Sequence, residues 1–124
     1  VADWRSDDAS DRKLKKTRDG LPALTFTENP DILATIAKSK NRPLLVVGFA
    51  AETDNVLAHA KAKRERKACD WIVANDVSPE TGIMGGSENA VTLISEEGSE
   101  TWPRMTKREV AKRIADRVAQ ALAE

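Results

Sequence analysis

The sequence has 124 residues, with 20 Lys and Arg against 20 Asp and Glu and a formal net charge of zero. This length allows one hydrophobic core, and zero net charge excludes a global field that would recruit nucleic acid or a membrane. No apolar run approaches the roughly 18 residues of a membrane helix, and the first residues do not resemble a signal peptide. The single cysteine, Cys69, cannot form an internal disulfide, which favours a reducing cytoplasm.

The first 27 residues combine a dense charge run with two alternating stretches. Acidic and basic side chains crowd residues 3–19, and a solvated loop accounts for most of them. Lys13-Leu14-Lys15 alternates as a short exposed strand does, and residues 24–27 alternate again. Because Asp19-Gly20 between them is a turn signal, a hairpin or flap is predicted over residues 13–27.

A helix start follows at Asn29-Pro30-Asp31. Asn29 is the predicted N-cap, Pro30 fits the first helical position because it lacks a donor, and Asp31 meets the positive end of the helix dipole. The apolar stripe expected to face the core consists of Ile32, Leu33, Ile36 and Ala37.

Residues 44–47 form an uninterrupted apolar run of good β-formers. Such a short run without alternation predicts a central parallel strand that is covered on both faces. Gly48 directly after it would let a ligand approach the backbone, and Thr53 is the expected N-cap of the next helix. Because ligands of open α/β sheets bind beyond the carboxyl ends of the strands, we expect a nucleotide site on this strand, its loop and the helix behind it.

The predicted helix from about residue 54 to residue 68 ends in a cluster of cations: Lys61, Lys63, Arg64, Arg66 and Lys67. Lys63 and Lys67 continue the face begun by Val56 and Ala60, so they are expected to lean over the sheet edge. The other three cations are interpreted as solvated, which is also the commoner explanation for any basic helix face. His59 has no acidic neighbour evident in the sequence and is interpreted as a surface residue.

Residues 70–74 predict a second strand, which closes in Asn75 and Asp76. Two strands separated by one helix form a parallel βαβ unit, so Asn75 and Asp76 are expected to arrive near Gly48 and Phe49. A third strand is predicted over residues 90–95, with a turn at 97–98 and a return strand at 100–102. A capping box at residues 106–109 opens a C-terminal helix whose apolar face comprises Val110, Ile114, Val118 and Leu122.

Six ordered segments together resemble one known family: residues 1–5, 13–16, 29–32, 47–53, 63–67 and 74–77. They are similar to the C-terminal half of the phosphopantothenoylcysteine synthetase domain of the bacterial bifunctional coenzyme A biosynthesis protein. The resemblance covers essentially the whole chain and implies an α/β fold, a three-layer Rossmann-like parallel sheet with a β-hairpin flap. Residues 1–124 would be the C-terminal part of that single domain, because the family's glycine-rich first turn and its activating asparagine have no counterpart in them.

The resemblance also implies a reaction. In that family phosphopantothenate reacts with CTP to form an acyl-cytidylate in the presence of magnesium, and the amine of cysteine then displaces CMP. Cations are needed because a carboxylate attacks an anionic triphosphate and charge builds up on the leaving pyrophosphate. Family members are dimeric, with the 13–27 hairpin as a candidate interface, and no flavin is expected because the decarboxylase domain is absent. CTP or ATP as the nucleotide stays open, since related eukaryotic enzymes use ATP.

The family's site residues are carried over position by position. Phe49 matches the residue beside the base, and Lys63 and Lys67 match nucleotide-binding lysines. Lys13 matches a nucleotide contact associated with converting the acyl-cytidylate to product. Asn75 and Asp76 are typical of the family, but a turn that caps the strand end explains them equally well; Asp76 is a candidate magnesium ligand and the other metal ligands are unknown. The remaining expected nucleotide contacts are Asp3, Pro30, Asp31, Ile32 and Leu33.

Two other classes of function compete with the ligase. A non-catalytic nucleotide-binding module would hold phosphates through Lys63 and Lys67 without activating an acid. Nucleic-acid binding through residues 61–67 is disfavoured by zero net charge and by the lack of stacking aromatic residues beside the basic run.

Overall fold

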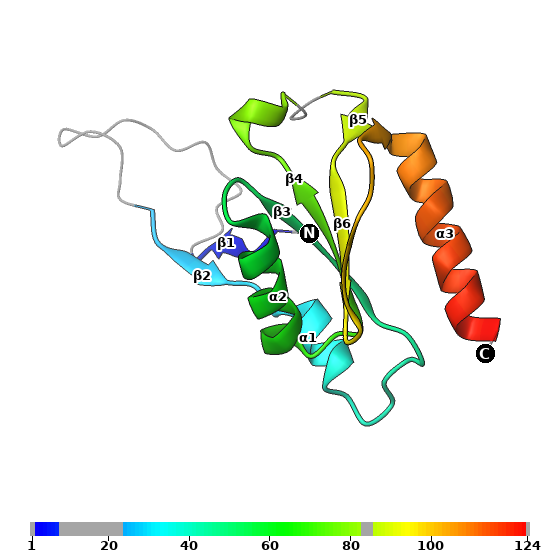
Figure 1. Ribbon diagram of the computed structural model, residues 1–124. Helices are drawn as coiled ribbons and strands as arrows, with labels where there is room; N and C mark the ends of the chain where they lie inside the picture. The colour runs from blue at the N-terminus through cyan, green and yellow to red at the C-terminus, as the bar shows by residue number, and fades with distance from the viewer. Residues whose placement is uncertain (1, 8–23, 83–85, 124) are drawn as a thin grey trace. The chain divides into compact units, whose positions relative to one another are not determined.

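The computed structural model describes residues 2–7, 24–82 and 86–123. These residues divide into two compact units, residues 1–32 and residues 33–124. The described elements are β1 (Trp4–Ser6), β2 (Phe26–Glu28), α1 (Ile32–Ala37), β3 (Val47–Glu52), α2 (Val56–Lys67), β4 (Trp71–Asp76), the 3-10 helix η1 (Pro79–Thr81), β5 (Glu88–Asn89), β6 (Val91–Ser95), β7 (Gly98–Thr101), β8 (Met105–Thr106) and α3 (Lys107–Ala123), as Figure 1 shows.

The second unit is an α/β layer structure built on a four-stranded sheet in the order β3-β4-β6-β7. β3 and β4 are parallel, whereas β6 runs antiparallel to both β4 and β7. α2 and α3 lie on opposite faces of this sheet (Figure 1). The predicted α/β class is therefore confirmed, but the sheet is mixed and only its β3–β4 pair is parallel.

Two hydrophobic clusters cover the two faces of the sheet. One contains Ile72 and Ala74 of β4 with Ala60 of α2, and the other contains Val73 of β4 with Val110 of α3. Successive residues of β4 thus point to opposite faces, as the pleat of a strand requires. β4 is buried on both sides, which explains the near-continuous apolar sequence at residues 71–74.

The observed strand begins later in the chain than the strand predicted at residues 44–47. β3 spans Val47–Glu52, and Leu44 is 92% exposed. Gly48 therefore lies inside the strand and does not open a ligand loop. A Cβ atom on Gly48 would lie 2.6 Å from Leu33 Cδ2 and 2.9 Å from Ile72 Cδ1, so this glycine makes room for Leu33 of α1 against the sheet.

The predicted cap and stripe of α1 are wrong in detail. The helix begins at Ile32, and the Asn29 side chain instead donates to the Ala2 carbonyl at 2.8 Å and accepts from Arg5 at 3.1 Å. Of the expected apolar stripe, Ala37 is buried and Leu33 is half-buried, whereas Ile32 and Ile36 are exposed.

The start of α2 also differs from the prediction. The N-cap is Asn55, not Thr53, and the helix begins at Val56. Asn55 has φ 44° and ψ 45° and makes no side-chain capping hydrogen bond. Asparagine tolerates this left-handed conformation better than most residues, so it turns the chain sharply at this position.

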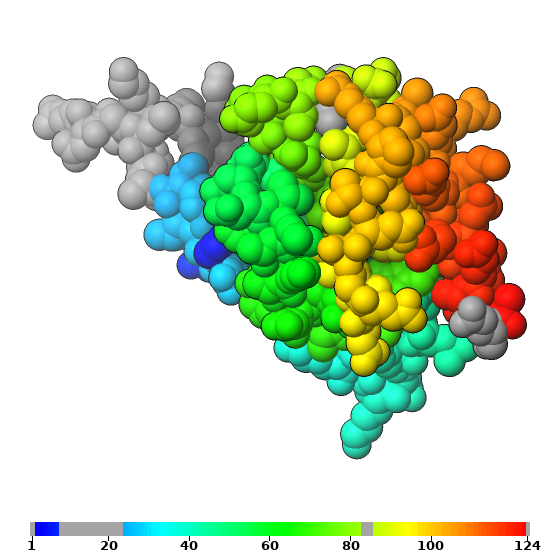
Figure 2. All heavy atoms as spheres, viewed as in Figure 1, coloured from blue at the N-terminus to red at the C-terminus, as the bar shows by residue number. Residues whose placement is uncertain are grey.

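The C-terminal elements agree with the sequence. β6 and β7 form the predicted antiparallel pair, and the capping box is confirmed at the start of α3. The Thr106 amide donates to Glu109 Oε2 at 3.2 Å, and the Glu109 amide donates to Thr106 Oγ1 at 3.1 Å. In Figure 2, α3 is coloured orange to red, and the fully exposed strand β7 lies on the surface between it and α2. None of the described helices is long and apolar enough to cross a membrane.

The first unit contains a small antiparallel pair, β1 and β2, in which Trp4 lies opposite Glu28 and Ser6 opposite Phe26. The pair is extended by the Asp7 amide, which donates to the Thr25 carbonyl at 2.9 Å. Trp4, Leu24 and Phe26 are each more than half exposed. The predicted strand around Lys13 and the turn at residues 19–20 lie outside the described residues.

Candidate functional site

The carboxyl ends of β3 and β4 lie side by side, as the parallel βαβ prediction requires. The register pairs Ala51 with Asn75 and Glu52 with Asp76. Phe49 and Gly48 lie two and three residues before Ala51, about 7 to 10 Å back along the strand. The expectation that Asn75 and Asp76 arrive near Gly48 and Phe49 is therefore met only in part. Asn75 is the diagonal neighbour of Phe49 on the same face of the sheet, whereas Asp76 pairs with Glu52, four residues after Gly48.

Asp76 organises the turn that leaves β4. Its Oδ1 accepts a hydrogen bond from the Ser78 amide at 3.0 Å, and its own amide donates to the Ala90 carbonyl at 2.9 Å. Thr81 Oγ1 donates to the Ser78 carbonyl at 2.8 Å and closes the turn. The turn-capping interpretation of Asp76 thus has direct support, since Oδ1 is already occupied.

Metal-ligating side chains do not converge on this turn. Within residues 2–7, 24–82 and 86–123, no three Cys, His, Asp or Glu side chains come together as a metal site. Because Mg²⁺ is commonly held by one or two carboxylates together with substrate phosphates, Asp76 stays a candidate magnesium ligand.

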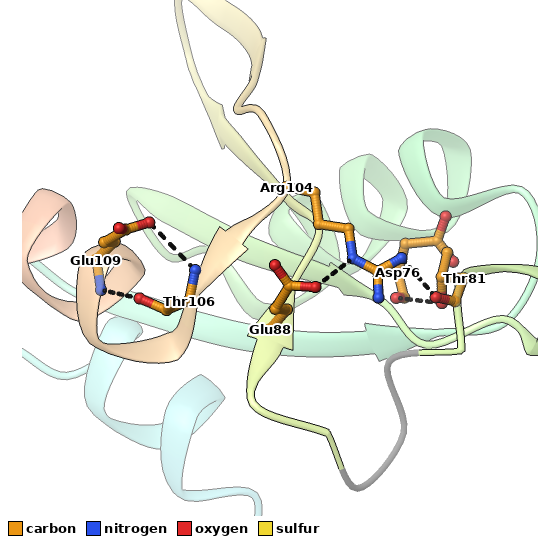
Figure 3. Close-up of polar contacts among 6 residues, drawn as sticks. All are labelled: Asp76, Thr81, Glu88, Arg104, Thr106 and Glu109. Carbon is orange, nitrogen blue, oxygen red and sulfur yellow. Dashed lines mark hydrogen bonds and ion pairs between the residues drawn. The ribbon is translucent and has the colours of Figure 1, made fainter.

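Arg104 joins this turn to the neighbouring β5–β8 ribbon (Figure 3). Its Nη1 donates to the Thr81 carbonyl at 2.6 Å, and its Nε donates to Glu88 Oε1 at 3.2 Å. β5 pairs with β8, which directly follows Arg104 and sets Glu88 opposite Thr106. No sequence signal indicated Arg104, because its partners lie 16 and 23 residues away along the chain.

Phe49 and Asn75 belong to the same face of the sheet. Val47 packs in the cluster that contains Val73, and strand alternation places Phe49 and Asn75 on that face as well. Phe49 is 59% exposed on the edge strand of the sheet. Among the described residues, Asn75 Oδ1 is buried and has no hydrogen-bond partner.

The basic end of α2 lies far from the carboxyl ends of β3 and β4. α2 starts beyond the carboxyl end of β3 and ends before the amino end of β4, so Lys63 and Lys67 lie toward the amino end of β4. Both lysines are half-buried, as expected for the shared face. They are on the face opposite to Phe49 and at the opposite end of the sheet from Asn75 and Asp76. The structure therefore does not place the lysines at the carboxyl ends of the strands, where the nucleotide site is expected.

Arg64 was interpreted as a solvated cation, which is wrong. Its Nε donates to the Asp70 carbonyl at 2.8 Å, where α2 turns into β4. The Asp70 carboxylate accepts from Arg42 at 2.6 Å and from the Val46 amide at 2.8 Å. These bonds hold together the segment that leads into β3 and the turn that leads from α2 into β4.

His59 lies on α2, and Cys69 lies two residues after its end. His59 Nδ1 lies 3.6 Å from Glu52 Oε2 and 3.9 Å from Asp54 Oδ1, so its interpretation as a residue without acidic neighbours is wrong. Glu52 reaches it because α2 folds back from the end of β3. Cys69 is buried, and burial raises the pKa of its thiol, which keeps the thiol protonated and makes it a poor nucleophile.

The other expected nucleotide contacts divide between the two units. Asp3, Pro30, Asp31 and Ile32 belong to the first unit and are exposed, and the Asp3 carbonyl accepts from the Asn29 amide at 2.8 Å. Leu33 belongs to the second unit and packs against Gly48. Lys13 lies outside the described residues. The nucleotide contacts stay predictions.

Comparison with known proteins gives one consistent result. Residues 1–122 match the DNA/pantothenate metabolism flavoprotein C-terminal domain. The coenzyme A biosynthesis bifunctional protein CoaBC of Vibrio vulnificus (strain YJ016) is 40% identical over 120 residues, which cover 95% of this chain and 30% of the relative. The protein of the same name from Escherichia coli (strain K12) is 38% identical with the same coverage. The chain thus spans about 30% of the length of these curated relatives.

Solved structures agree. The crystal structure of the C-terminal domain of CoaBC matches with a TM-score of 0.71 and 31% identity, over 99% of this chain and 51% of that one. A Cab2 mutant in complex with phosphopantothenate-cysteine matches with a TM-score of 0.60 over 89% of this chain and 36% of that one, and at 18% identity it shows the fold alone. The resemblance carried by the six sequence segments is confirmed. Because the match extends over residues 1–122, the chain belongs to the family of the DNA/pantothenate metabolism flavoprotein C-terminal domain.

Proposed function

We propose that this chain is the C-terminal part of a phosphopantothenate–cysteine ligase domain that uses CTP in coenzyme A biosynthesis. The observation that carries the proposal is the family match over residues 1–122, together with 40% identity to a coenzyme A biosynthesis bifunctional protein. The compound bound to the Cab2 mutant, phosphopantothenate-cysteine, has the composition of the product of such a reaction.

The proposed reaction has two steps. A carboxylate oxygen of phosphopantothenate attacks the α-phosphorus of CTP, the bond to the β-phosphate breaks, and pyrophosphate leaves. The amine of cysteine then attacks the acyl carbon of the acyl-cytidylate and loses a proton. A C–N bond forms, the C–O bond to the cytidylate breaks, and CMP leaves with the electron pair.

Cations have a defined task in each step. Lys63 and Lys67 would offset the charge of the triphosphate. This role rests on the family resemblance and not on their places toward the amino end of β4. Lys13 would stabilise the oxyanion that develops when cysteine attacks the acyl-cytidylate. Phe49, which is 59% exposed, would lie beside the base.

Magnesium enters the proposal with the triphosphate, because Mg²⁺ is usually held through substrate phosphates and few protein carboxylates. The described residues gather no three-ligand metal site, so no proposed step depends on an ion held by them. A cytoplasmic homodimer is part of the same proposal. Trp4 of β1, Phe26 of β2 and Leu24 just before β2 support it, since a group of exposed large apolar side chains is typical of an interaction surface.

Pyrophosphate release by the complete protein that contains these residues tests the proposal. Release should require phosphopantothenate and CTP, and CMP formation with amide product should further require cysteine. ATP replaces CTP in a parallel reaction to decide the nucleotide. A protein that binds CTP but releases no pyrophosphate with either substrate added would instead be the non-catalytic nucleotide-binding module.

A further inference from the structure

Arg64 anchors the last turn of α2, the turn that ends in Lys67. Its Nε donates to the Asp70 carbonyl oxygen at 2.8 Å, across the turn between α2 and β4. Asp70 is itself well fixed: its carboxylate accepts from Arg42 at 2.6 Å and from the Val46 amide at 2.8 Å. Its own amide also donates to the Val46 carbonyl at 2.9 Å. Arg64 therefore ties the end of the helix to a residue that is held to the segment leading into β3.

The last turn of α2 needs such an anchor because its own composition loosens it. Four cations lie within five residues: Lys63, Arg64, Arg66 and Lys67. The helix dipole favours cations at this end, but those three and four positions apart repel one another. Ala68 then ends the helix with φ 60° and ψ 27°, a left-handed conformation that strains an alanine and usually belongs to glycine. A strained residue of this kind persists only where its surroundings hold it in place.

Lys63 and Lys67 depend on this anchor to different degrees. Lys63 follows Ala60, which is fully buried, by three residues, so core packing already fixes its backbone. Lys67 is the last residue of α2 and directly precedes the strained Ala68, so its backbone depends on the bond made by Arg64. Loss of that bond should displace Lys67 and leave Lys63 where it is.

We propose that Arg64 is a positioning residue of the ligase, which holds Lys67 in place for contact with the triphosphate of CTP. The inference rests on the proposed function, because it takes Lys67 as a nucleotide contact. Arg64 acts through Lys67 and not by touching the nucleotide, since its Nε is already bonded to Asp70.

The test measures pyrophosphate release by the complete protein, with KM for CTP, KM for phosphopantothenate and kcat determined separately. Arg64→Gln should raise the KM for CTP about fivefold, the size of one lost hydrogen bond, and leave the other two constants unchanged. A merely structural role would lower the fraction of folded enzyme and therefore kcat, without raising the KM for CTP. Arg64→Lys keeps the charge but loses the planar guanidinium, so its KM for CTP should lie between the values of the wild type and Arg64→Gln.

Arg66→Gln is the matched control, because Arg66 carries the same charge in the same helical turn and is exposed. Its loss should raise the KM for CTP by less than about twofold, the effect expected of one solvated charge. The comparison of the two glutamine variants therefore separates the position of Lys67 from the net charge of the helix end.

Double-mutant cycles identify the residue through which Arg64 acts. When Lys67 is already alanine, Arg64→Gln should have no further effect on the KM for CTP beyond that of Arg66→Gln. When Lys63 is already alanine, Arg64→Gln should keep its full effect, since the backbone of Lys63 is fixed by core packing.

An unchanged KM for CTP in Arg64→Gln, or equal effects of Arg64→Gln and Arg66→Gln, overturns the positioning role while the ligase proposal stands. An undiminished effect of Arg64→Gln in the Lys67→Ala background overturns it as well. If the wild type releases no CTP-dependent pyrophosphate, the proposed function fails, and this inference with it. Where Arg64→Gln melts below the assay temperature, Arg64→Lys and its cycle with Lys67→Ala give the same decision.

Discussion

At the scale of single residues, Lys63 and Lys13 are assigned to different steps of the proposed reaction. Lys63→Ala should weaken CTP binding about tenfold, because it removes a half-buried cation expected to face the phosphates. Lys13→Ala should leave CTP binding intact and slow the step in which cysteine displaces CMP. Equilibrium CTP binding and single-turnover CMP release measure the two effects separately.

Lys61→Ala is the control for the first variant, since Lys61 is exposed on the same helix and carries the same charge. Its CTP affinity should match that of the wild type. If Lys13→Ala abolished CTP binding, the division of labour between the two lysines would be wrong.

The second prediction concerns the effect of Gly48 on the stability of the fold. Gly48→Val places methyl groups where a Cβ alone already lies 2.6 Å from Leu33 Cδ2 and 2.9 Å from Ile72 Cδ1. Overpacking of this kind costs about 1–3 kcal/mol, so urea unfolding should show that loss. Ala51→Val on the exposed face of the same strand should stay within about 0.5 kcal/mol of the wild type. Equal stability of the two variants would contradict the packing role of Gly48.

Single residues are also where sequence reasoning was least able to anticipate the structure. Asn29 has every local feature of an N-cap, yet Ala2 and Arg5 from the start of the chain take its side chain. His59 receives Glu52 as a neighbour only because α2 folds back over the end of β3. That Asn75 Oδ1 has no hydrogen-bond donor among the described residues is evident only once the atoms around it are placed. None of these partners is adjacent in sequence, so no local signal encodes them.

At the scale of elements, the contact between α3 and β7 has a predictable pH dependence. The hydrogen bond from Arg117 lowers the pKa of Glu100 below its usual range. A carboxyl whose pKa is lower in the folded state stabilises the fold above its unfolded pKa, and this contribution disappears as the pH falls through the folded value. Because the pair is exposed, it is worth only a few tenths of a kcal/mol.

Urea unfolding of the wild type and of Arg117→Ala at pH 7 and pH 3 tests this dependence. The wild type should be slightly more stable at pH 7, and the difference should shrink toward pH 3 as Glu100 takes up a proton. Arg108→Ala removes the same charge from the same helix away from Glu100, so any difference it causes should not follow the Glu100 titration. A wild-type advantage that does not shrink as the pH falls would exclude the ion pair as its cause.

Elements with strong local signals were predicted well. α3 begins at the capping box because Thr106 and Glu109 satisfy each other's amides, which needs only four neighbouring residues. β6 and β7 follow from an apolar run, a turn and a return strand. The predicted strand at residues 44–47 is too early because hydrophobicity alone favours that run. In the structure Leu44 is exposed, whereas Ala50 of β3 is buried against α2. Packing against α1 and α2 fixes that register, and the sequence pattern does not reveal it.

At the scale of the whole molecule, the fold class could be predicted but the site could not be assembled from topology. The parallel pair β3–β4 and helices on both faces follow from the strand–helix–strand pattern. The same pattern led to the expectation that Lys63 and Lys67 lean over the sheet edge at the nucleotide site. A crossover helix runs back along its strands, so its basic end reaches the amino end of β4 instead.

The last prediction concerns what these residues do without the rest of the family's domain. The chain covers 51% of the matched chain of the CoaBC C-terminal domain. The family resemblance implies that the glycine-rich first turn and the activating asparagine belong to the part that residues 1–124 do not match. A polypeptide of residues 1–124 should therefore release no pyrophosphate from CTP and phosphopantothenate, whereas the complete protein should. Circular dichroism of the shorter polypeptide must show a folded α/β protein, so that a missing half-site and not unfolding explains the inactivity. CTP turnover by these residues alone would require an activating group among them, and the assignment of the first step to another part of the domain would have to be abandoned.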